Sequence, residues 1–164
     1  MLFDYHPDIA NEFPTIRAGI IHVTGLVNGP SAPPLVAEYS AEQAAVVSAI
    51  GETLLSELPS VAAWRRAFSS FGVKPTQYRS AIESLLRRLT KKGDIPNISA
   101  LVDLGNLVSI RHRLPVAFFD QAQISGVTTV RFAEGTESFT DLGSSESLHP
   151  EPGEVVFVDD AGVV

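Results

Sequence analysis

The spacing of apolar residues predicts a long helix in the first third of the chain. From Ser40 to Leu58, apolar side chains recur every three or four residues, which is the spacing of one buried helix face. Ser40 and Gln43 have the spacing of a capping box, and Pro59 cannot continue the helix. The apolar face consists of Ala44, Val47, Ile50, Leu54, Leu55 and Leu58. We therefore expect a helix over residues 40–58.

Two further helices are predicted before residue 93. Ser60 can cap a short helix that carries Trp64 and Phe68 and stops at Gly72. The next helix begins near Thr76 and ends in a basic turn, the charge that the negative C-terminal end of a helix favours. Its apolar face consists of Tyr78, Ile82, Leu85, Leu86 and Leu89.

A fourth helix is predicted between Ser99 and the basic run at residues 111–113, which precedes Pro115. Its apolar stripe consists of Leu101, Leu104, Leu107 and Val108. After Pro115 the apolar period becomes that of a strand, so we expect the helix over 99–112 to pack against a sheet.

Strands are predicted on both sides of the helical segment. Residues 17–27 are apolar and β-branched and are bounded by a turn sequence, which is typical of a buried strand. Residues 116–119, 127–132 and 154–158 have the same character and are separated by turns that contain glycine. Helices in the middle with strands before and after predict an α+β fold.

The C-terminal residues predict the start of a hairpin. A turn at residues 159–162 leads into Val163 and Val164, which we expect to pair with residues 154–158. A second strand of two residues leaves an apolar edge. We therefore expect that residues 1–164 form a single domain that lacks its C-terminal part, with an open edge that can pair with another copy of the chain.

Length and composition indicate a globular protein. With 164 residues, 45% hydrophobic and 19% charged, the chain is long enough to bury a core and too apolar for disorder. The absence of cysteine excludes disulfides, thiolate zinc sites and a cysteine nucleophile. No apolar run approaches the ~20 residues of a membrane helix, and the first residues lack a secretory pattern. We expect a cytoplasmic protein without a membrane partner.

Charge is distributed unevenly along the chain. The net charge is −7, but residues 64–131 carry eleven bases and four acids, whereas residues 1–63 and 132–164 are strongly acidic. A local basic segment on an acidic protein favours a phosphate-binding face, although basic residues also cover ordinary solvated helices. The candidate RNA-binding residues are Arg65, Arg66, Lys74, Arg79, Arg87, Arg88, Lys91, Lys92, Arg111 and Arg131.

The common catalytic motifs are absent. There is no G-x-S-x-G, no phosphate-binding P-loop, no G-x-G-x-x-G and no H-E-x-x-H. The histidines are far apart in the sequence, and none has a second ligand at helical spacing: His6, His22, His112 and His149. We therefore expect no metal site and no cofactor, and the catalytic residues, if there are any, are unknown.

Asp103 and Asn106 form the most distinctive polar pair. They lie three residues apart, so they share a face of an otherwise apolar predicted helix. A polar group that is buried without a partner costs about 1–3 kcal/mol, so both side chains need partners. They either fix a neighbouring loop by hydrogen bonds or line a polar pocket that orients a substrate, and we expect them to face a partly enclosed cavity.

Three short segments carry a family resemblance. They are NISALVDLGN at residues 97–106, LPVAFFD at 114–120 and VRFAEGTE at 130–137. Their order and spacing resemble the B3/B4 domain of the bacterial phenylalanyl-tRNA synthetase β-subunit and its free-standing relatives. The resemblance covers residues 74–164 well and the first 70 residues poorly.

The resemblance implies an editing-type fold with a substrate pocket. In the synthetase, this domain hydrolyses tyrosine that is wrongly attached to phenylalanine tRNA. Asn106 falls on the pocket asparagine of the family and Asp103 on its neighbouring aspartate, and the matching segment places Ala117, Phe118 and Asp120 in the pocket as well. Ala117 stands where the family has histidine, and the family's pocket glutamate falls beyond residue 164, so tyrosine specificity does not carry over.

Three functions therefore stay open. The first is an aminoacyl-tRNA deacylase that acts on mischarged tRNA in trans. The second is a non-catalytic RNA-binding module that uses the basic middle segment. The third is a protein that binds a free amino acid or a related small molecule, with the basic helices merely solvated. The charge distribution favours tRNA or aminoacyl-tRNA as the partner, and the alanine at position 117 favours binding over hydrolysis.

Overall fold

The computed structural model describes residues 2–140 and 143–164, and its contacts divide the chain into two compact units. The sheet unit comprises residues 1–22, 71–73 and 119–164, and the helical unit comprises residues 23–70 and 74–118. Each unit has its own cluster of buried apolar residues. The expectation of a single domain over residues 1–164 stays a prediction.

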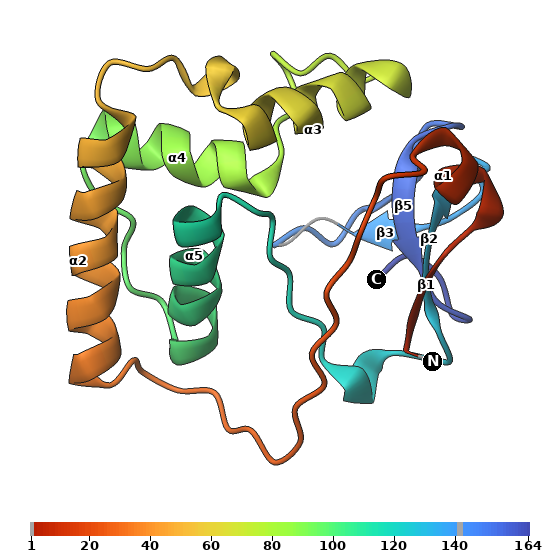
Figure 1. Cartoon of the computed structure of the whole chain (residues 1–164). Helices are drawn as coiled ribbons and strands as arrows, with labels where there is room; N and C mark the ends of the chain where they lie inside the picture. The colour runs from red at the N-terminus through yellow and green to blue at the C-terminus, as the bar shows by residue number, and fades with distance from the viewer. Residues whose placement is uncertain (1, 141–142) are drawn as a thin grey trace. The chain divides into compact units, whose positions relative to one another are not determined.

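The helical unit contains four α-helices around one apolar core. They are α2 (Pro33–Ile50), α3 (Pro59–Ser70), α4 (Ala81–Lys92) and α5 (Ala100–His112), with a short 3-10 turn η1 (Leu55–Glu57) before α3. Figure 1 shows α2 and α5 side by side, and α5 packs against both α2 and α4. The buried residues at the centre are Tyr39, Val46, Ile50, Leu58, Val61, Ile82, Leu86, Leu89, Ile95, Leu107 and Ile110.

The sheet unit is built on a three-stranded mixed sheet. Its order is β1 (Phe3–Tyr5), β2 (Thr128–Phe132) and β5 (Val155–Val158), with β1 parallel and β5 antiparallel to β2. A separate two-stranded ladder joins β3 (Phe139–Thr140) to β4 (Ser147–Leu148). The remaining elements are α1 (Pro7–Glu12) and the 3-10 turn η2 (Gln121–Gln123). Helices and a mixed sheet in one chain confirm the α+β class.

The boundaries of two predicted helices are corrected. α2 begins at Pro33, because a proline fits the first turn of a helix and needs no N–H partner there, and not at the capping-box pattern of Ser40. It ends at Ile50, where Gly51 adopts a positive φ of 51° that other residues avoid. α4 begins at Ala81 and not near Thr76, because the Ser80 hydroxyl accepts a hydrogen bond from the Glu83 N–H.

Two of the predicted strands are wrong. Residues 17–27 form no strand, and Ile21 and Val27 are 88% and 92% exposed. A β-branched sequence forms a strand only where a neighbouring strand pairs with it, and the described residues offer none. Residues 116–119 are also irregular, and the ring of Phe118 packs against Gly105 of α5. The packing partners of α5 within its unit are therefore helices, in place of the expected sheet.

The other expected elements are confirmed. α3 and α5 form close to the predicted places, and β2 and β5 fall within residues 127–132 and 154–158. The turn at residues 159–162 leads back to Val163, which forms an antiparallel bridge with Val158. The Asp159 N–H donates to the Gly162 carbonyl across this turn, at 2.8 Å. Among the described residues, no helix is both long and apolar enough to cross a bilayer.

Candidate nucleic-acid interface

The basic end of α4 carries its cations along one side of the helix, and all of them are exposed except Arg87, which is half-buried. Arg87, Arg88, Lys91 and Lys92 fall within an arc of about 140° at 3.6 residues per turn. Buried apolar residues occupy other positions around the same helix and anchor it to the core. Gly93 ends α4 in the left-handed conformation, and its N–H donates to the Leu89 carbonyl. The helix therefore presents its cations to solvent from a fixed support.

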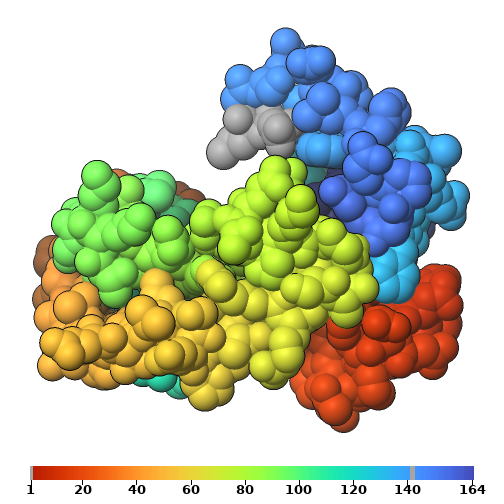
Figure 2. Space-filling view, turned by 90° about the horizontal axis from the view of Figure 1, so that it is seen from above, coloured from red at the N-terminus to blue at the C-terminus, as the bar shows by residue number. Residues whose placement is uncertain are grey.

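α3 and the segment after it add cations to the same unit. Arg66 lies on α3, and Lys74 follows that helix; both are exposed. Figure 2 shows α3 in yellow and α4 in green on the face of the helical unit that is seen from above. Five cations on or directly after these two helices form no ion pair within the described part of the chain. We call them the α3–α4 basic face: Arg66, Lys74, Arg87, Lys91 and Lys92.

Five of the ten candidate RNA-binding residues are paired with carboxylates: Arg65, Arg79, Arg88, Arg111 and Arg131. Arg111 of α5 donates to Glu38 at 2.9 Å and to Glu42 at 2.6 Å, both on α2. Arg88 lies 3.9 Å from Asp94, and both side chains are largely exposed. A cation that already has a carboxylate partner gains less from a phosphate. The candidate interface is therefore smaller than the sequence predicts.

Arg65 and Glu83 form an ion pair between α3 and α4. The Arg65 guanidinium donates to the two Glu83 carboxylate oxygens at 3.0 and 2.7 Å, and Arg79 lies 3.8 Å from the same carboxylate. The Glu83 side chain is 1% exposed, and the attraction to these two guanidinium groups offsets the hydration that a buried carboxylate loses. Glu83 is not among the residues that the sequence patterns predicted. Its spacing from Ser80 is that of a capping box, and this pattern could have identified it.

Arg131 belongs to the sheet unit and has a structural partner there. It pairs with Glu137 at 2.5 Å and lies 4.0 Å from Glu134. The Glu137 carboxylate also accepts hydrogen bonds from the backbone N–H groups of Glu134 and Gly135. The backbone bonds first, and then Arg131, hold the pKa of Glu137 at about 2. Arg131 therefore acts as the counter-ion of a buried carboxylate.

Formal charge separates between the two units. The helical unit contains ten bases and seven acids, a net charge of +3, and the sheet unit contains two bases and twelve acids, a net charge of −10. A phosphate backbone is therefore attracted to the helical unit and repelled by the sheet unit. The net charge of −7 conceals this difference.

The Asp103 side chain is completely buried and fixes a loop by hydrogen bonds. One carboxylate oxygen accepts from Ser31 at 2.5 Å and from Asn97 at 2.8 Å, and the other accepts from the Ile98 N–H at 2.8 Å. Burial alone raises the pKa of Asp103, but these hydrogen bonds outweigh it, and the pKa is lowered. Of the two roles considered for Asp103, this geometry is that of a structural aspartate.

Asn106 is half-buried and lies beside Tyr39 of α2. Burial raises the pKa of Tyr39 to about 12, and the nearby Asn106 amide opposes that rise. The Tyr39 hydroxyl is buried, and in the described structure no hydrogen bond of normal geometry reaches it. Asn106 therefore faces the interior next to an unsatisfied hydroxyl.

The remaining predicted pocket residues are exposed. Ala117 and Asp120 lie on the surface, and Phe118 is 52% exposed. The Asp120 carboxylate caps η2 by accepting from the Ala122 N–H at 3.0 Å. Asp120 belongs to the sheet unit and the others to the helical unit. That Asp103, Asn106, Ala117, Phe118 and Asp120 bind a substrate stays a prediction.

No group of three or more His, Asp and Glu side chains is arranged to hold a metal ion in residues 2–140 and 143–164. His22 contacts the Gln121 side chain at 2.5 Å, and His149 contacts the Glu137 carbonyl at 2.6 Å. Both histidines therefore have protein partners of their own.

Comparison with known proteins finds a family match over most of the chain. Residues 63–164 match the family model described as the B3/4 domain. A curated relative is the phenylalanine–tRNA ligase beta subunit of Chromobacterium violaceum, which is 32% identical over 89 residues. That match covers 54% of this chain and 11% of the relative, so the similarity concerns a small part of the larger protein. No solved structure matches the chain.

Proposed function

We propose, from the premise that this chain belongs to the B3/4 domain family, that it binds tRNA through the α3–α4 basic face. The membership confirms the family that the three sequence segments indicate. The observation that carries the proposal is the group of five cations without ion pairs in a unit of net charge +3. Protein cations bind phosphates mainly by releasing condensed counter-ions, and this requires cations that are not already neutralised.

The relative supports tRNA as the form of RNA. That relative is named as a subunit of a phenylalanine–tRNA ligase, and its region of similarity covers 54% of the present chain. Because the chain corresponds to only 11% of the relative, the ligase activity of the whole enzyme is not part of the proposal.

Binding without hydrolysis is the function that we propose. Hydrolysis of an aminoacyl ester needs a positioned water and donors for the developing oxyanion. Asp103 already accepts three hydrogen bonds in a buried position, and Ala117 supplies no imidazole. A deacylation assay with mischarged tRNAs tests this part separately, and hydrolysis above the uncatalysed rate would contradict it.

The binding claim is tested by charge reversal on α4. The variant in which Arg87, Arg88, Lys91 and Lys92 are all changed to Glu should lose retention of total tRNA in a low-salt shift assay. The reason is that three free cations become acids and the helical unit loses its positive charge.

The matched comparison removes two charges in each variant. Lys91→Gln with Lys92→Gln should weaken binding, whereas Arg17→Gln with Arg111→Gln should not. Arg17 donates only to neighbouring backbone carbonyls in the sheet unit, and Arg111 is held by two glutamates. Equal weakening by both pairs would show that only net charge matters, and unchanged retention by the fourfold variant would refute the proposal.

A further inference from the structure

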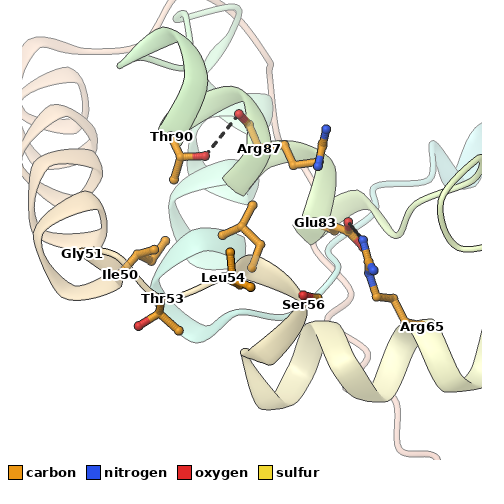
Figure 3. A pocket seen from close by; sticks show the side chains of 10 residues that line it. Ile50, Gly51, Thr53, Leu54, Ser56, Arg65, Glu83, Arg87 and Thr90 are labelled. Carbon is orange, nitrogen blue, oxygen red and sulfur yellow. Dashed lines mark hydrogen bonds and ion pairs between the residues drawn. The ribbon is translucent and has the colours of Figure 1, made fainter.

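A cavity of about 310 Å³ lies within the helical unit, beside the α3–α4 basic face. It is bounded by the C-terminal end of α2, by η1 with the turn before it, and by α4 (Figure 3). Ligand pockets generally measure roughly 300–1,000 Å³, so this cavity has room for one small group. None of the sequence patterns pointed to it.

The cavity combines an apolar part with hydroxyl groups. Ile50, Leu54 and Leu55 supply the apolar part, and Leu54 is 62% exposed at its mouth. Thr53 and Ser56 add hydroxyls from the segment that follows α2. Such a lining suits a flat, largely apolar group that also has hydrogen-bonding edges.

The charges around the cavity leave one cation free. Its charged lining residues are Arg65, Glu83 and Arg87. Figure 3 shows the Arg65 and Glu83 side chains meeting, and this ion pair neutralises those two groups. Arg87 is half-buried and has no carboxylate partner in the described structure. A ligand that neutralises Arg87 must carry a negative charge.

The position of Arg87 connects the cavity with the basic face. Arg87 and Lys91 are four residues apart on α4, so their side chains are neighbours on the helix surface. The guanidinium of Arg87 presents a planar fork of donors, a geometry that suits phosphate oxygens. A phosphate backbone that crosses Lys91 thus reaches the mouth of the cavity within one helical turn.

We propose that this cavity binds one nucleotide, with its phosphate on Arg87 and its base against Leu54 and Ile50. The proposal rests on the tRNA binding proposed above and names a site within it: an unpaired nucleotide of the RNA enters the cavity while the neighbouring phosphates contact the basic face. A free nucleotide has the same chemistry, so it occupies the same site.

Binding is tested with four probes: AMP, adenosine, inorganic phosphate and benzoate. Each probe is titrated into the protein, and the amide chemical shifts of the protein are followed by NMR. AMP should bind about tenfold or more tightly than adenosine or inorganic phosphate, because each of these has only part of the contacts. The shifts should centre on residues 50–56 and 87–90. Benzoate combines a carboxylate with an aromatic ring, so equal binding of benzoate would overturn the assignment to nucleotides.

Variants locate the site. Arg87→Ala should weaken the binding of AMP about tenfold or more. Arg87→Lys should restore only part of this affinity, because lysine keeps the positive charge but lacks the planar guanidinium. Arg88→Ala is the matched control, since it removes a cation of the same helix that is paired with Asp94 and does not line the cavity. Equal effects of Arg87→Ala and Arg88→Ala would overturn the proposal.

A competition experiment separates this inference from the proposed function. AMP at saturation should reduce the affinity of an unpaired oligoribonucleotide for the protein but leave part of its salt-dependent binding intact. If tRNA binds and AMP does not, the nucleotide site is refuted and the proposed function stands. If AMP binds at Arg87 but no RNA does, the proposed function fails and the cavity is a site for free nucleotides.

Discussion

Asp103 and Glu83 are buried carboxylates on the inner sides of neighbouring helices, and they are stabilised in different ways. Asp103 is surrounded by neutral donors from a hydroxyl, an amide and a backbone N–H. Glu83 is held by the guanidinium of Arg65. In both cases the carboxylate ties separate segments together, so its first effect is on folding.

Asp103→Ala should destabilise the helical unit. The substitution leaves the donors of Ser31, Asn97 and Ile98 without their acceptor, and a hydrogen bond to a charged group contributes about 1.5–3 kcal/mol. We expect the free energy of unfolding to fall by about 3–5 kcal/mol in urea titrations, because three donors lose their acceptor at about 1–3 kcal/mol each. Asp94→Ala, at an exposed position, is the control. A loss similar to that of the control would contradict the structural role.

Glu137 predicts a pH dependence of stability. Its pKa falls from 4.5 to about 2 on folding, so its carboxylate stabilises the folded state above about pH 4.5. This contribution should decrease as the pH falls from about 4.5 to about 2. Glu137→Gln should flatten that part of the curve of unfolding free energy against pH. If the unfolding free energy of the variant falls as steeply over this pH range as that of the wild type, other carboxylates dominate the pH dependence.

At the scale of the element, α5 depends on a close approach between Gly105 and Phe118. A Cβ atom at position 105 would overlap the Phe118 ring, whose Cζ atom would lie 3.0 Å away. Glycine inside a helix costs about 0.5–1 kcal/mol relative to alanine. Gly105 therefore lowers the intrinsic stability of α5, and the closeness of the Phe118 ring explains why a glycine stands there.

Gly105→Ala should not give the usual gain in helix stability, because the added methyl group displaces Phe118. In the Phe118→Ala background, the same change should stabilise the protein by about 0.5–1 kcal/mol. Thermal unfolding of both single variants and the double variant measures the coupling. Additive effects would mean that the ring moves aside without cost.

The elements also show how far sequence patterns reach. α5 and the C-terminal half of α4 could be predicted, because each combines a helical apolar period with a terminal signal close by in the sequence. Such local signals could not decide whether residues 17–27 form a strand, because a strand needs a partner from elsewhere in the chain. The roles of Asp103 and Arg111 depend on partners 72 and 69 residues away, so spacing alone left them open.

At the scale of the whole molecule, the separation of charge is the property that predicts a function. The basic segment at residues 64–131 was visible in the sequence, and ten of its eleven bases, all except Arg131, fall in the helical unit. The structure adds which cations are free, and this distinction reduces ten candidates to five. The cavity beside Arg87 could not be predicted, because it is formed by segments that are distant in the sequence.

The most direct test of RNA binding is the salt dependence of the affinity of the unmodified protein for total tRNA. A plot of log K against log salt has a slope of about −0.7 per neutralised phosphate on single strands and about −0.9 on duplexes. If the five free cations each contact a phosphate, fluorescence anisotropy should give a slope of about −3.5 to −4.5. A slope near zero, or no binding at the lowest salt concentration, would contradict the proposed function.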